Sequence, residues 1–148
     1  MQYQNTSNIL RDIQPNAILK ATKEVDSSIE IAKSLDLPLH PDPPKNWDSL
    51  AAVAILNRYL SPNEGIKLLD AGGEHYSVVL RQLYQLGFTN LTCINLTFKN
   101  SFVKNKISFQ FGDLTNTPFS KSTFHAITCL SVIEHGMMLK STSKRCLE

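Results

Sequence analysis

The sequence predicts an α/β fold with a parallel sheet, and the second half of the chain carries the pattern behind this prediction. Short apolar segments alternate with segments of helical periodicity from about residue 66 onward. These apolar segments are too uniformly hydrophobic for strands that have one face in water. Strands of this kind belong to a parallel sheet that helices cover on both faces.

Length and composition restrict the function classes. The chain has 148 residues, one domain's length, of which 42% are hydrophobic. Charged residues make up 19%, and the formal net charge of +2 is too small to indicate a nucleic-acid partner. We expect no membrane span, because no apolar run approaches the roughly 20 residues needed, and no secretion leader. The 3 cysteines form no C-x-x-C pair, which predicts a reducing, cytoplasmic compartment and no metal site.

Residues 1–45 are predicted to form an amino-terminal extension. A helical pattern runs through residues 17–35. It is followed by four prolines within residues 37–44, which exclude both a helix and a central strand. This proline-rich connector should therefore be extended.

A second helix should start at Asn46 or Asp48, either of which can cap it, and end near Leu60. Apolar residues recur in this helix at helical spacing and should pack on a sheet face. They are Ala52, Ile55, Leu56, Tyr59 and Leu60.

Four strands and one more helix are predicted in the rest of the chain. The strands cover residues 66–71, 91–96, 107–111 and 124–131, and the helix covers residues 77–86 with a glycine after it. Only residues 97–106 separate the second strand from the third, whereas a parallel crossover takes a dozen or more. This connection must be one tight turn of helix or an irregular arch.

Ligands of parallel α/β sheets bind at the carboxyl ends of the strands, so these ends form the candidate site. At the first of them Asp70 precedes Gly72 and Gly73, and glycines before a helix allow backbone N–H groups to approach a ligand closely. Asp70 would either fix this loop or lie near a cationic group of the ligand. Asn95 ends the second strand, where such folds place a residue that binds ribose hydroxyls. The alternative is a tight turn without a ligand.

Three ordered motifs resemble the class I S-adenosylmethionine (SAM) dependent methyltransferases, particularly small-molecule enzymes of the methyltransferase-11 or -25 type. The motifs are Leu68-Leu-Asp-Ala-Gly-Gly73, Gly112-Asp-Leu-Thr-Asn-Thr-Pro-Phe119 and Phe124-His-Ala-Ile-Thr-Cys-Leu-Ser-Val-Ile-Glu-His-Gly136. The resemblance implies that residues 46–136 form the SAM-binding half of a Rossmann-like three-layer sandwich. It implies about four of the family's seven strands in the order 3-2-1-4, followed by a tail unlike the family over residues 137–148. The chain would then be a truncated methyltransferase.

The resemblance also assigns the residues just after each strand to parts of the cofactor. They are Asp70, Gly72 and Gly73 at the methionine end with Glu74 beside them, Asn95 at the ribose with Leu96 next to it, Asp113 and Leu114 at the adenine, and Leu130 and Ser131 beside the fourth strand. The family loop runs D-x-G-x-G-x-G, whereas Glu74 and Tyr76 occupy its later glycine positions. Asn95 stands where the family has an acid. His135 is either a base or a packing residue, so no catalytic residue is assigned.

Two other function classes remain open. An NAD(P)-dependent oxidoreductase is disfavoured by the absence of G-x-G-x-x-G. A catalytically silent nucleotide-binding or interaction module would keep the fold without the chemistry. For an enzyme, the expected substrate is a small-molecule acceptor that the sequence does not identify. The outer edge of residues 124–131 should lie open, which predicts self-association or a partner chain at that edge.

Overall fold

The structure, a computed structural model, describes residues 8–14 and 18–132. These residues divide into two compact units. The helical unit lies within Met1–Asn63 and Tyr76–Phe88, and the sheet unit lies within Glu64–His75 and Thr89–Glu148. The helices and the mostly parallel sheet confirm the predicted α/β class. The expected domain boundaries after residues 45 and 136 stay predictions.

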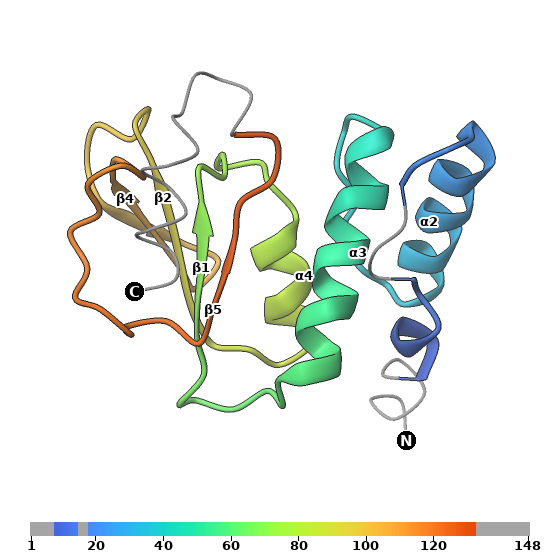
Figure 1. Cartoon of the computed structure of the whole chain (residues 1–148), viewed down its shortest axis with the longest axis horizontal. Helices are drawn as coiled ribbons and strands as arrows, with labels where there is room; N and C mark the ends of the chain where they lie inside the picture. Colours follow the sequence, from blue (N-terminus) through green and yellow to red (C-terminus); the bar gives the residue numbers. More distant parts are fainter. Residues whose placement is uncertain (1–7, 15–17, 133–148) are drawn as a thin grey trace. The chain divides into compact units, whose positions relative to one another are not determined.

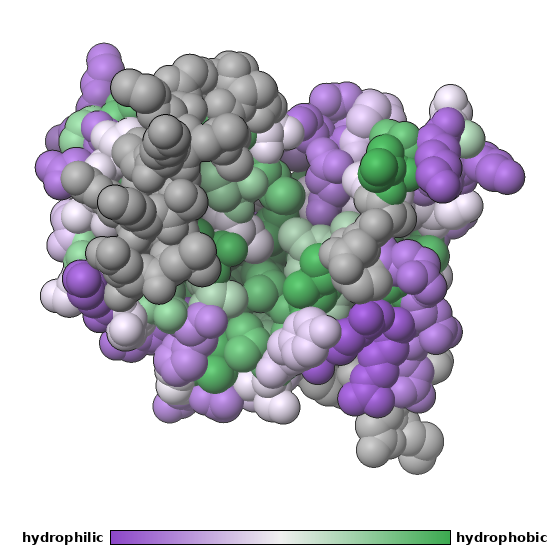
Figure 2. All heavy atoms as spheres, viewed as in Figure 1, coloured by the Kyte–Doolittle hydropathy of each residue, from purple (hydrophilic) through white to green (hydrophobic). Residues whose placement is uncertain are grey.

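The helical unit is built around its central helix. Its helices are α2 (Thr22–Ser34), α3 (Pro44–Tyr59) and α4 (Val79–Gln85). α3 packs against both α2 and α4 (Figure 1). α2 buries Val25, Ser28 and Ala32, and hydrophilic residues gather over its outer side (Figure 2). No helix in the described part of the chain is long and apolar enough to cross a membrane.

The buried side of α3 agrees only in part with the predicted one, because Leu56 alone among the predicted residues is buried. Tyr59, which was expected to pack on a sheet, is 75% exposed. The residues that α3 buries are Asn46, Ser49, Leu50, Val53, Ala54 and Leu56. The prediction was wrong because it followed apolar residues only, whereas this face also takes up small polar residues whose burial depends on hydrogen bonding and packing.

Neither Asn46 nor Asp48 caps α3, and Asn46 instead holds the proline-rich connector. α3 begins at Pro44. A proline is tolerated in the first turn of a helix, because the N–H group that it lacks would have no hydrogen-bond partner within the helix. The Asn46 side chain accepts a hydrogen bond from the His40 N–H (2.8 Å) and donates one to the His40 carbonyl oxygen (3.1 Å). Gln82 of α4 donates to the carbonyl oxygen of Pro38 (2.8 Å). Residues 37–43 of the connector are non-helical, as predicted, whereas Pro44 contradicts the prediction because it is the first residue of α3.

The sheet unit has the strand order β3-β4-β2-β1-β5 within the described residues (Figure 1). Its strands are β1 (Lys67–Ala71), β2 (Asn90–Asn95), β3 (Phe102–Lys104), β4 (Ile107–Phe111) and β5 (Ala126–Thr128). β1 pairs in parallel with β2 and β5, and β2 pairs in parallel with β4. The predicted strands, now β4, β2, β1 and β5, therefore lie in the expected order. β5 is shorter than the predicted residues 124–131.

The connection between β2 and β4 contradicts the prediction of a helical turn or an arch. It contains β3, which pairs antiparallel with β4 at one edge of the described sheet. The chain runs back along the outside of β4 and then turns into it through Asn105 and Lys106, so no helical crossover is needed. Phe102 of β3 stacks on Phe109 of β4 with ring centroids 4.9 Å apart.

β5 lies at the other edge of the sheet among the described residues. Ile127 in the middle of β5 is 39% exposed, so this strand is not buried on both faces as predicted. An exposed strand edge can pair with another chain. Self-association or binding of a partner chain at this edge stays a prediction.

Lys106→Gly should stabilise the protein. Asn105 and Lys106 have φ values of 52° and 62°, and this left-handed conformation strains a lysine but not a glycine. We expect the free energy of unfolding, measured by urea denaturation, to rise by about 0.5–1 kcal/mol. Lys104→Gly, the matched control within β3, should lower it. Destabilisation by both substitutions would contradict the turn geometry.

Candidate functional site

The structure brings the predicted site segments to one edge of the sheet unit. Asp70 of β1 is in register with Cys93 of β2 and with Thr128 of β5. Asn95 at the end of β2 is in register with Phe111 at the end of β4. Because these strands are parallel, their carboxyl ends, and the loops that follow them, share an edge.

Asp70 is buried beneath the loop that follows β1. The residue is 3% exposed, and its carboxylate accepts a hydrogen bond from the Thr128 hydroxyl at 2.8 Å. Burial raises the pKa of Asp70 to about 6, although the Thr128 hydrogen bond acts in the opposite direction. A Cβ atom at position 73 would collide with the Asp70 carboxylate, so Gly73 lies directly against it. Of the two expected roles of Asp70, this position supports fixing the loop.

Gly72 meets two requirements that only a glycine satisfies here. Its φ is +85°, in the left-handed region. A Cβ atom at this position would lie 2.5 Å from a methyl group of Val132, just after β5. The Gly72 N–H donates to the carbonyl oxygen of Ile94 in β2 at 2.7 Å. The first loop residue is therefore held between the ends of β2 and β5.

The Asn95 side chain is bound to the protein at both of its polar atoms. Its Nδ2 lies within hydrogen-bond distance of the carbonyl oxygens of Gly72 (2.9 Å) and Gly73 (3.2 Å), and of the Glu74 Oε1 (3.3 Å). Its Oδ1 accepts from the Thr97 N–H at 2.9 Å. Asn95 thus joins the end of β2 to the loop after β1. Because its polar atoms have these partners, it has less hydrogen-bonding capacity for a ribose than its position in the sequence predicted.

Cys93 adds a further contact to the same loop. Its Sγ donates to the Gly73 carbonyl oxygen at 3.1 Å, and the residue is buried. Burial raises the pKa of this thiol, and the negative charges of Asp70 and Glu74 raise it further. A thiol held in its protonated form is a poor nucleophile. Cys93 is therefore a structural residue of the loop.

The segment after β4 forms a hydrogen-bonded turn. The Asp113 Oδ1 accepts from the N–H (2.8 Å) and from the hydroxyl (2.7 Å) of Thr115. Leu114 packs on the sheet face formed by Leu69, Ala71 and Ile94. Gly112 is buried against Ile94, where a Cβ atom would lie 2.8 Å from the Ile94 Cβ. The two residues predicted for adenine thus differ: Asp113 orders the turn and Leu114 contributes to the core.

Two apolar side chains at this edge are exposed. Leu96, a predicted site residue, is 63% exposed, and Phe111 is 57% exposed. Phe111 and Thr97 were not among the predicted site residues. Phe111 could have been recognised as the last apolar residue of a predicted strand. Thr97 could have been recognised because it follows Asn95 by two positions, the spacing at which an Asn side chain accepts from a backbone N–H group in a turn.

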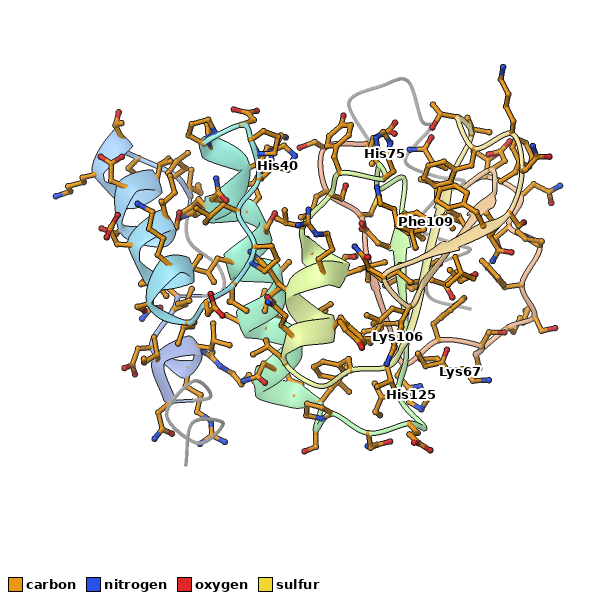
Figure 3. All side chains as sticks on the ribbon, turned by 180° about the vertical axis from the view of Figure 1, so that it is seen from behind. His40, Lys67, His75, Lys106, Phe109 and His125 are labelled. Carbon is orange, nitrogen blue, oxygen red and sulfur yellow. The ribbon has the colours of Figure 1, made fainter. Side chains whose placement is uncertain are left out.

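The remaining candidates lie around the same unit. Leu130 and Ser131 follow β5 and are half-buried, and Ser131 has a left-handed φ of 55°. His75 lies at the end of the sheet where the loop is, whereas His125 lies at the opposite end with Lys67 (Figure 3). The Lys67 N–H donates to His125 Nδ1 at 3.1 Å, so His125 pairs with the start of β1. His135 lies outside the described residues.

No group of three or more His, Cys, Asp or Glu side chains that could hold a metal ion occurs in the part of the chain that the structure describes. Comparison with known proteins adds no assignment: no family model, no curated protein and no solved structure matches the chain significantly. The resemblance to SAM-dependent methyltransferases therefore stays a prediction.

Asp70→Asn should remove a pH dependence of stability. Because the pKa of folded Asp70 is raised above that of the unfolded carboxyl, the folded state holds more protons between about pH 4 and 6. The free energy of unfolding should therefore fall as pH rises through this range, by up to roughly 3 kcal/mol for a shift of about two pKa units. Urea denaturation at pH 4–7 measures this slope. The exposed Asp26 provides a matched control, Asp26→Asn, and an unchanged slope in Asp70→Asn would contradict the assignment.

Asn95→Ala should loosen the loop after β1. The substitution removes the side-chain bonds to the Gly72 and Gly73 carbonyl oxygens, so the free energy of unfolding should fall by about 1–2 kcal/mol. Hydrogen exchange of the amides in residues 72–75 should become faster. Asn90→Ala, at the opposite end of β2, is the matched control and should leave that exchange unchanged. Slow exchange in Asn95→Ala would show that other contacts hold the loop.

Proposed function

We infer that the chain binds SAM at the carboxyl edge of its parallel strands and acts in methyl transfer to a small-molecule acceptor. One observation carries this proposal: the parallel pairing of β4, β2, β1 and β5 brings the glycine loop, Asn95 and Asp113 to one edge. This is the edge at which parallel α/β sheets bind nucleotide-like ligands. The finer assignment of the fold as Rossmann-like belongs to the same proposal.

The side chains at this edge fit the adenosine part of SAM. An adenine ring offers two flat apolar faces, and the exposed side chains of Leu96 and Phe111 are suited to contact them. The exocyclic amine of adenine is a hydrogen-bond donor, and the carboxylate of Asp113 is an acceptor. Phe111 would act here as a stacking surface of a kind that tolerates any base.

The charges at the edge also fit the rest of the cofactor. SAM carries a sulfonium and an ammonium group, so its site needs negative charge. Burial disfavours the charged form of Asp70, which leaves the half-buried Glu74 and Asp113 as the better carboxylates for this purpose. Gly72 and Gly73 keep the loop backbone free of side chains beside these acids.

The chemistry that SAM supplies when bound is an activated methyl carbon, which an acceptor attacks in an in-line displacement. The residues of the chain then contribute mainly by orienting the reactants and by excluding water. A general base is required only for an acceptor that must lose a proton. His75 belongs to the loop after β1 and lies at this end of the sheet (Figure 3).

Calorimetric titration of the full chain with SAM, S-adenosylhomocysteine and NADH tests the proposal. Binding of the two adenosyl sulfur compounds without NADH supports it. Binding of NADH alone would favour an oxidoreductase, and binding of none of the three would favour a silent interaction module. Either of these last two results would overturn the proposal.

Phe111→Ala should weaken binding of S-adenosylhomocysteine by roughly tenfold, because removal of one base-stacking side chain costs about 1–3 kcal/mol. The side chain is exposed, so the fold should tolerate its loss. Val103→Ala, at an exposed apolar residue of the edge strand β3, is the control and should bind like the unmodified chain. Equal affinity of Phe111→Ala and the control would exclude stacking on Phe111.

A further inference from the structure

An acidic side chain lies beside the neutral residue at the end of β2. The Glu74 Oε1 is 3.3 Å from the Asn95 Nδ2 and 3.5 Å from the Thr97 hydroxyl oxygen. Both neighbours are hydrogen-bond donors, and Glu74 is half-buried. The loop after β1 therefore brings a carboxylate to the end of the neighbouring strand.

A ribose needs acceptors at this place. Its two neighbouring hydroxyl groups donate hydrogen bonds, and a carboxylate can accept both. The Asn95 Oδ1, which would be the acceptor on β2, already accepts from the Thr97 N–H and so has one lone pair left for a diol that offers two donors. A hydrogen bond to a charged carboxylate is also roughly twice as strong as one to a neutral amide.

We propose that Glu74 binds the ribose hydroxyls of the adenosyl ligand, and that Asn95 and Thr97 are positioning residues that orient its carboxylate. The inference rests on the proposed function, because it names the residue of that site that recognises the sugar. A carboxylate has about four acceptor positions, so hydrogen bonds from Asn95 and Thr97 are compatible with a bound diol.

The proposal gives two departures from the family pattern a common explanation. Glu74 stands at a glycine position of the family loop, and Asn95 stands at the position of an acid. In this chain the end of β2 carries an amide donor, and the loop beside it carries the carboxylate.

The test compares two ligands that differ only in the sugar: S-adenosylhomocysteine and its analogue that lacks both ribose hydroxyls. Calorimetry measures the affinity of each for the full chain. Glu74→Gln should weaken binding of S-adenosylhomocysteine by about tenfold and leave binding of the dideoxy analogue unchanged. Glu64→Gln removes the same charge at the opposite end of β1 and should affect neither ligand.

Each other outcome identifies what is wrong. Equal losses for both ligands in Glu74→Gln, or no loss, would overturn the role of Glu74 and leave the proposed function standing. If the unmodified chain binds neither ligand, the proposed function falls and the inference falls with it. Should Glu74→Gln fail to fold, Glu74→Asp, with its shorter side chain, must lower the preference for the hydroxylated ligand; an unchanged preference would overturn the role.

Discussion

The candidate site depends on how the loop after β1 is seated on the ends of β1 and β2. The Asn95 amide donates to the carbonyl oxygens of Gly72 and Gly73, and the Asp70 carboxylate lies directly against Gly73. A side chain at either glycine would separate the loop from these contacts. These contacts set the direction in which the backbone leaves β1. They therefore also set the position of Glu74.

Burial separates the described acids near the carboxyl edge of the sheet into two groups. Asp70 is enclosed between Thr128 and the loop, and its raised pKa records the cost of burying a carboxyl group there. Asp70 accepts the Thr128 hydroxyl and lies directly against Gly73, so its position serves the loop after β1. Glu74 and Asp113 are half-buried at the edge itself, where their charge is less costly and can meet a partner. A motif that contains an acid therefore does not by itself distinguish a structural carboxylate from a binding one.

The antiparallel strand β3 lies at the edge of the sheet beyond β4, and it affects the site through its pairing with β4. By returning along the outer side of β4, it places β4 between two neighbours, so Phe109 is buried against Phe102 and Phe98. Phe111, two residues further on, lies beyond the last pair with β3 and is exposed. The hairpin thus stabilises the strand while leaving its last aromatic side chain available at the carboxyl edge.

Local patterns in the sequence were sufficient for the parallel strands, for their order with the help of the family resemblance, and for the positions of Asp70, Gly72 and Asn95 at strand ends. Hydrophobic periodicity and glycine placement are properties of neighbouring residues, so they can be read without knowing the fold. The tertiary structure decided which side chains are buried or hydrogen-bonded within the protein. Asn95 meets the loop across 23 positions of sequence, the buried face of α3 includes Ser49, and β3 exists through its pairing with β4. Hydrogen-bond partners and burial depend on residues brought together by folding, and no local pattern contains them.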